Sequence, residues 1–149
     1  MMKANELRIG NYVVIDNETS WPHLKDIPMV VMGISQNMGF DSNWTHSLSL
    51  RLLESENIIS NSFSQLIQFI QPIVLTEEWL ERFGCKEGNK LDYTYSRFGL
   101  SWKDGYKYWS VTDLVDGTYL TKVEWVHEWQ NFVFAMNGGE LQLKGGSNG

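Results

Sequence analysis

The segment from residue 121 to residue 141 constrains the fold most, because it predicts one capped helix with an unusually wide apolar face. Thr121 and Glu124 have the spacing of a capping box, whose two side chains accept hydrogen bonds from backbone N–H groups at a helix start. Asn137-Gly138-Gly139 predicts the helix end. The apolar residues span an arc of roughly 200°, so we expect cover on two sides. They are Val123, Trp125, Val126, Trp129, Phe132, Val133, Phe134 and Met136.

A chain of 149 residues that is 42% hydrophobic and 20% charged can bury a sizeable core without disulfides or metal. It forms one ordinary domain or two very small ones that share a core. Cys85 is the only cysteine, so no intramolecular disulfide forms. The first residues contain no apolar signal region, and the longest apolar run, residues 29–32, is far too short for a membrane helix. We therefore expect a cytoplasmic protein without a membrane partner.

The charge of the chain is acidic in both halves. The net charge is −6; residues 1–75 carry four basic and seven acidic side chains, and residues 76–149 carry eight and eleven. Sequence-independent binding to nucleic acid draws its affinity from Lys and Arg contacts with phosphates. Charge therefore does not support a nucleic-acid partner, although it leaves that alternative open.

Residues 1–75 predict a β-rich, small-barrel-like region: a small, strongly bent sheet or a barrel of about five strands. Residues 12–15 and 29–34 are β-branched, aromatic or apolar, as strands prefer. Residues 40–53 predict a strand pair. Residues 67–75 fit a strand or a helix, and Pro72 limits a strand there to a sheet edge.

Residues 76–143 predict a short helix, an antiparallel β-meander and the long closing helix. Thr76 is a good N-cap for the short helix, and Gly84 is placed to end it. Residues 91–120 alternate as a meander, in which Asp104-Gly105 and Asp116-Gly117 predict two-residue type I′ hairpin turns. Residues 140–143 predict a short strand, and residues 144–149 a flexible tail. The expected fold class is α+β, with the two regions either separate or one compact domain.

Three blocks, residues 5–13, 72–84 and 126–141, resemble a family of small uncharacterised proteins encoded by gut anaerobic bacteria and their prophages. Family members open on a Leu-Arg-Ile-Gly-Asn stretch, carry a Leu-Thr-Glu-Glu-Trp-Leu centre and close on a Val-His-x-x-Gln-Asn-like helix. The blocks cover about a quarter of the chain, and they depart from the pattern at Val74, where it often has proline, and at Trp129, where it often has leucine. The resemblance implies a phage or mobile-element accessory protein and brings no catalytic residues.

Residue chemistry offers little for catalysis. Cys85 follows the short helix, where the helix dipole opposes a thiolate, so we interpret it as structural or incidental. His127 and Asn131 lie one helical turn apart. One interpretation of His127 is a base or a group that contacts a partner, and the other is a boundary histidine hydrogen-bonded to a neighbouring strand. His23 and His46 are isolated, and no metal-ligand spacing occurs. We predict no catalytic, metal or cofactor site, and no cofactor.

The aromatic residues of one hairpin have two readings. Stacking surfaces for sugars or single-stranded bases use such side chains, as do protein interfaces. Alternation places Tyr106 and Tyr108 on one face and Trp109 on the other. The candidate interaction surface is Tyr106, Tyr108, Trp109, His127 and Asn131.

From these patterns we expect a non-enzymatic accessory protein with an unidentified protein partner. The partner would meet this hairpin face or the N-terminal barrel. The alternatives are a nucleic-acid-associated small-barrel module and, less favoured, an enzyme that uses Cys85 or His127.

Overall fold

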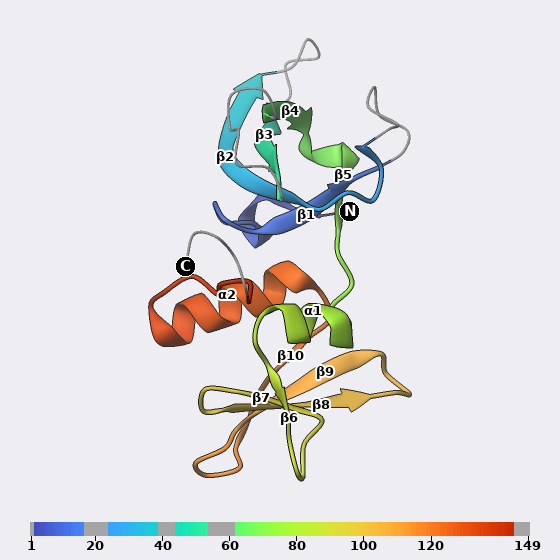
Figure 1. Cartoon of the computed structure of the whole chain (residues 1–149). Helices are drawn as coiled ribbons and strands as arrows, with labels where there is room; N and C mark the ends of the chain where they lie inside the picture. The colour runs from blue at the N-terminus through green and yellow to red at the C-terminus, as the bar shows by residue number, and fades with distance from the viewer. Residues whose placement is uncertain (1, 17–23, 39–43, 54–61, 145–149) are drawn as a thin grey trace. The chain divides into compact units, whose positions relative to one another are not determined.

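The computed structural model describes residues 2–16, 24–38, 44–53 and 62–144. The chain divides into two compact units, Met1–Ile73 and Val74–Gly149 (Figure 1). Each unit contains a five-stranded antiparallel sheet, and both described α-helices belong to the second unit. The predicted α+β class is therefore confirmed. Within the described ranges, no helix has both the length and the apolar character that crossing a membrane requires.

The first sheet has the strand order β4-β3-β2-β1-β5. It is built from β1 (Tyr12–Ile15), β2 (Met29–Met38), β3 (Trp44–Leu52), β4 (Ser62–Leu66) and β5 (Ile70–Pro72). The 3₁₀ turn η1 (Ala4–Glu6) precedes β1, and η3 (Ile67–Phe69) separates β4 from β5. Of the range 40–53, for which a strand pair was predicted, residues 44–52 form one strand, β3, and residues 40–43 lie outside the described part.

Of the two arrangements expected for this region, a strongly bent sheet or a barrel, the barrel is wrong, because the five-stranded sheet stays open. β4 pairs with β3 and β5 pairs with β1, and no ladder between described residues joins β4 to β5. The reason lies in β5, which is three residues long and ends at Pro72, a residue without a backbone N–H to donate. The placement of Pro72 on an edge strand agrees with the sequence pattern.

The core of the first unit follows strand alternation. Leu48 and Leu50 of β3 are fully buried, and Ser49 between them is exposed. The opening block packs through its backbone: Gly10, at φ 98°, donates to the Val31 carbonyl at 2.8 Å. The buried side chain of Asn11 accepts from the Arg8 amide at 2.7 Å. The Leu-Arg-Ile-Gly-Asn stretch therefore forms the turn that leads into β1.

The second unit is a meander with the strand order β10-β9-β8-β7-β6. Its strands are β6 (Lys86–Glu87), β7 (Tyr93–Tyr95), β8 (Phe98–Lys103), β9 (Tyr108–Asp113) and β10 (Tyr119–Val123). The helices α1 (Glu77–Arg82) and α2 (Val126–Asn137) lie on the same side of this sheet (Figure 1).

Aromatic rings join α2 to the sheet. The ring of Phe132 meets that of Phe98 edge-on at 5.0 Å, and the ring of Trp129 meets that of Tyr95 at 6.0 Å. Trp129 is fully buried, and Phe98 is equally inaccessible. The wide apolar arc of the closing segment is thus partly explained by packing on this sheet.

The ends of both helices test the capping predictions. Thr76 caps α1 and accepts from the Trp79 amide at 3.4 Å, while Gly84, at φ 84°, follows the helix end, as predicted. Gly138 ends α2 in the left-handed conformation and donates to the Phe134 carbonyl at 2.8 Å, which confirms the glycine stop.

The predicted capping box of Thr121 and Glu124 is wrong. Thr121 lies in β10 opposite Val111, and α2 begins only at Val126. Glu128 does the capping, since its Oε1 accepts from the amides of Glu124 at 3.0 Å and Trp125 at 3.1 Å. The β-branched Thr121 and Val123 favour the strand that extends the meander.

Both predicted two-residue hairpin turns are four-residue loops. Lys103 pairs with Tyr108, and the Asp113 amide bonds the Thr118 carbonyl at 2.8 Å, so the loops are residues 104–107 and 114–117. In each loop the fourth residue has a positive φ, 57° at Lys107 and 75° at Gly117. The predicted strand at 140–143 is also absent among the described residues: these positions have no strand assignment, although Leu141 is buried.

Candidate interaction surface

The outer face of the second sheet is the face opposite α1 and α2. Cross-strand partners share a face, and successive residues in a strand alternate between faces. The register therefore assigns ten strand positions to this outer face. They are Lys86, Thr94, Gly99, Ser101, Lys103, Tyr108, Ser110, Thr112, Tyr119 and Lys122.

Tyr106 and Tyr108 form an aromatic pair at one end of the outer face. Tyr106 lies in the β8–β9 loop with 78% of its surface exposed, and its ring centroid is 5.9 Å from that of the half-buried Tyr108. The Nζ atom of Lys122 lies 5.3 Å from the Tyr108 ring centroid, within the range of a cation–π contact. Two rings and a cation are thus presented together to solvent.

Charge on the outer face differs from that of the unit as a whole. Its ten strand positions include three lysines and no carboxylate, although residues 76–149 carry more acids than bases. Three carboxylates lie near the face: Glu124 pairs with Lys122 at 3.6 Å, Asp104 accepts from the Trp102 indole at 3.4 Å, and Asp92, just before β7, accepts from the Trp102 amide at 2.7 Å. Lys107 in the loop is also exposed, so lysines still outnumber the carboxylates near the face.

The opposite end of the outer face is covered by two leucines. A Cβ atom added at Gly99 would lie 2.0 Å from Leu91 Cδ1 and 2.8 Å from Leu114 Cδ2. These side chains therefore rest against the glycine backbone, and no larger residue fits there without displacing them. Lys103 and Tyr108 lie at the other end of the face, and Lys86 stays exposed at the edge of the Gly99 row.

The structure brings together only part of the surface predicted from sequence. Tyr106 and Tyr108 lie side by side, and Tyr108 and Trp109 point to opposite faces, as alternation predicted. Trp109 is 2% exposed, and its indole donates to the Leu75 carbonyl at 2.8 Å. His127 is 3% exposed, and Asn131 is half-buried on α2. Trp109 and His127 are thus buried and are not presented to solvent.

The buried thiol of Cys85 is placed for packing. Burial raises the pKa of this thiol to about 12. A nucleophilic cysteine needs the opposite shift, toward a thiolate at neutral pH. Among the described residues, no group of three or more His, Cys, Asp or Glu gathers as metal ligands would. Gln130 of α2 is also buried, at 1% exposure.

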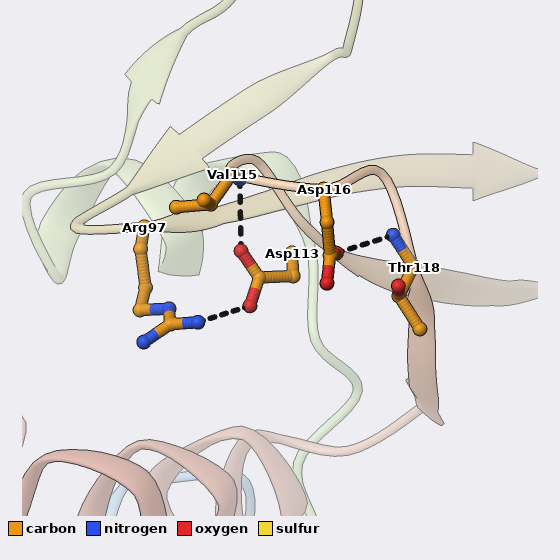
Figure 2. Close-up of polar contacts among 5 residues, drawn as sticks. All are labelled: Arg97, Asp113, Val115, Asp116 and Thr118. Carbon is orange, nitrogen blue, oxygen red and sulfur yellow. Dashed lines mark hydrogen bonds and ion pairs between the residues drawn. The ribbon is translucent and has the colours of Figure 1, made fainter.

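An ion pair links the two loops that flank the covered end of the face. Arg97, in the β7–β8 turn, donates to the buried Asp113 Oδ2, while Asp113 Oδ1 accepts from the Val115 amide at 2.8 Å (Figure 2). Asp116 Oδ1 accepts from the Thr118 amide at 2.9 Å in the same loop. The hydrogen bond from Arg97, followed by that from Val115, lowers the pKa of Asp113. This arrangement fixes the geometry of the two loops.

The first unit has its own exposed apolar positions, at the far end of the β2–β3 hairpin. Met38 and Trp44 are paired in register and are 58% and 59% exposed. Ile34, on the same face by alternation, is 37% exposed. Asn37 on the other face donates to Ser47 Oγ at 3.2 Å, so the hairpin is polar there.

Sequence reasoning missed the lysines of the outer face. Lys86, Lys103 and Lys122 are far apart along the chain, and charge counted by halves hides them. Their meeting depends on the register of four ladders, and the four-residue loops made that register unpredictable. Alternation within each strand could have identified the outward lysines once the strands were known.

In the comparisons with known proteins, no family model matches the sequence, and neither a curated protein nor a solved structure matches the chain.

Proposed function

We propose that this chain is a non-enzymatic accessory protein that acts by binding a macromolecular partner through Tyr106 and Tyr108. The observation that carries the proposal is the 78% exposure of Tyr106 beside Tyr108 on a sheet face that faces away from the helices. Tyrosine is enriched at binding surfaces because its ring supplies contact area at a low entropy cost. The raised pKa of Cys85 supports the absence of thiol chemistry.

A protein partner is the expectation from sequence, and the phage or mobile-element origin rests on the family resemblance alone. The runner-up, a nucleic-acid-associated module, receives support from a different feature than the one predicted. The N-terminal sheet is open, so a closed barrel does not favour it. The three lysines of the outer face favour the nucleic-acid-associated module instead.

Affinity capture with three forms of the immobilised chain tests the proposal. Wild type and Trp44→Ala should retain the same material from a lysate of the source organism, while Tyr106→Ala/Tyr108→Ala should lose it. Trp44 is a matched control because it is an exposed aromatic residue in the first unit. Retention of the same material by all three forms, or no retention, would contradict the proposal.

A further inference from the structure

We infer that the outer face of the second sheet binds single-stranded nucleic acid, with Tyr106 and Tyr108 stacking on bases and lysines contacting phosphates. The inference rests on the proposed function and names the partner of the same surface. It starts from the charge reversal on this face: three outward lysines and no outward carboxylate in the strands of an acidic unit. Phosphate contacts by lysine supply the sequence-independent part of nucleic-acid affinity.

The layout of the face suits a single strand of nucleic acid that lies across the sheet. Lys103 and Tyr108 are register partners, and Ser101, Ser110 and Lys122 form the next row. Tyr106 lies beyond them in the loop. The half-buried Ser101 carries a hydroxyl of the kind that donates to phosphate and sugar oxygens, whereas Ser110 is buried, and the hydroxyls of Thr94 and Thr112 donate to backbone carbonyls.

The aromatic pair favours a single strand over a duplex. Stacking on tyrosine requires bases whose ring faces are open, and a duplex keeps those faces covered by neighbouring bases. An open sheet face with exposed aromatic side chains and helices on the other side is a geometry that single-strand-binding modules use. The analogy concerns geometry alone.

The same positions fit a protein interface less well. None of the ten outward strand positions carries an aliphatic or methionine side chain, and the two leucines that cover the face, Leu91 and Leu114, lie at the Gly99 end, away from the tyrosine pair. Protein interfaces place desolvated apolar anchors at their centre and exclude lysine from it, whereas nucleic-acid interfaces are polar, wet and positively charged. A neutral sugar could stack on tyrosine but would not use the lysines.

Fluorescence anisotropy with the full chain tests this inference. The probes are labelled oligothymidylate and oligouridylate of about 12 nucleotides, a hairpin duplex, and inorganic polyphosphate as competitor. We expect both single strands to bind with a Kd on the order of 10 μM at about 50 mM salt, more tightly than the duplex. Three phosphate contacts predict a slope of log K against log salt of about −2.

Variants separate stacking from charge. Each of Tyr106→Ala and Tyr108→Ala should weaken single-strand binding roughly fivefold or more. Lys86→Gln, Lys103→Gln and Lys122→Gln combined should bring the salt slope close to zero. Lys25→Gln, an exposed lysine of the first unit, and Trp44→Ala should change neither quantity. These substitutions are at exposed or half-buried positions, so far-UV circular dichroism should stay that of wild type.

Three results would overturn the inference. One is the absence of oligonucleotide binding at about 100 μM protein. Another is binding that the tyrosine variants leave unchanged and that polyphosphate abolishes, which would indicate attraction of polyanions in general. The third is a captured protein that depends on the tyrosines and survives nuclease treatment while no oligonucleotide binds. That last result would leave the proposed function standing with a protein partner.

Discussion

Lys107 and Gly117 occupy equivalent positions in the two hairpin loops of the second sheet. Each is the fourth loop residue, and each donates its amide over 2.7 Å to the carbonyl of the residue before the loop, Lys103 or Asp113. Both have a positive φ, 57° and 75°. One loop therefore uses glycine for a conformation that the other imposes on lysine.

This equivalence predicts opposite effects of two substitutions. A residue with a Cβ atom is disfavoured in the left-handed region by about 1 kcal/mol relative to glycine. Lys107→Gly should therefore raise the free energy of unfolding by up to about 1 kcal/mol, and Gly117→Ala should lower it by about the same amount. Urea denaturation measures both. Gly105→Ala is the control, since Gly105 does not have a positive φ and a Cβ there meets no atom within 4 Å.

The capping role of Glu128 predicts which glutamate matters at the start of α2. Glu128→Ala removes the acceptor of two backbone amides and should cost about 1 kcal/mol of stability. Glu128→Gln keeps an acceptor oxygen and should cost less. Thr121→Ala and Glu124→Ala, at the positions of the capping box expected from sequence, should each cost less than Glu128→Ala. Thermal unfolding of the four variants measures these losses of stability. A larger loss for Glu124→Ala than for Glu128→Ala would contradict the observed cap.

The ion pair of Arg97 and Asp113 predicts a loss of stability in acid. The folded protein lowers the pKa of Asp113 below its ordinary value of 3.8. The stabilisation of the folded state by ionised Asp113 is therefore complete above pH 3.8, and it is lost as pH falls through the lower pKa that this group has in the folded state. Asp113→Asn should unfold more easily than wild type at pH 6, and the difference should narrow below about pH 4. A constant difference between the two urea midpoints across this range would exclude the linkage.

The buried thiol predicts slow labelling and a loss of stability in alkali. Folding raises the pKa of Cys85 from 9.0 to about 12. The contribution of the protonated thiol to the free energy of unfolding is therefore complete below pH 9 and is lost as pH rises toward 12. Within this window one bound proton corresponds to about 1.4 kcal/mol per pH unit. Cys85→Ala should flatten the pH dependence there.

A maleimide reagent should label native Cys85 at pH 7 far more slowly than it labels the urea-unfolded chain, because the thiol is both buried and protonated. The unfolded chain serves as the control for reagent quality. Equal rates in the two states would show that the thiol is accessible in the native protein.

Local rules predicted the parts of the fold that depend on neighbouring residues. Thr76 and Gly84 begin and end α1, and Gly138 ends α2, because caps and left-handed stops are set within a few residues. Alternation placed Leu48 and Leu50 in the core for the same reason.

The errors arose where longer-range pairing decided between local alternatives. Asp104-Gly105 suits a two-residue turn, but the pairing of Trp102 with Trp109 places a four-residue loop between the strands. That register lets the two indole rings meet at a centroid distance of 5.2 Å. Thr121 and Glu124 fit a capping box, but the ladder with β9 extends to Val123 and delays the helix.

The candidate surface was half predictable for a related reason. The period of two placed Tyr108 and Trp109 on opposite faces, and the loop keeps Tyr106 beside Tyr108. Which face the helices cover depends on tertiary packing, so the burial of Trp109 and His127 was not accessible to pattern analysis. The outward lysines required the register of the whole meander.

The first two residues of the second unit are bonded to the segment just before α2 and to β9. Val74 forms an antiparallel bridge with Trp125, the Leu75 amide bonds the Glu124 carbonyl at 3.0 Å, and the Leu75 carbonyl receives the Trp109 indole. Cutting the polypeptide between Ile73 and Val74 would sever none of these bonds. A fragment of residues 74–144 should therefore fold by itself and retain the tyrosine and lysine side chains of its sheet.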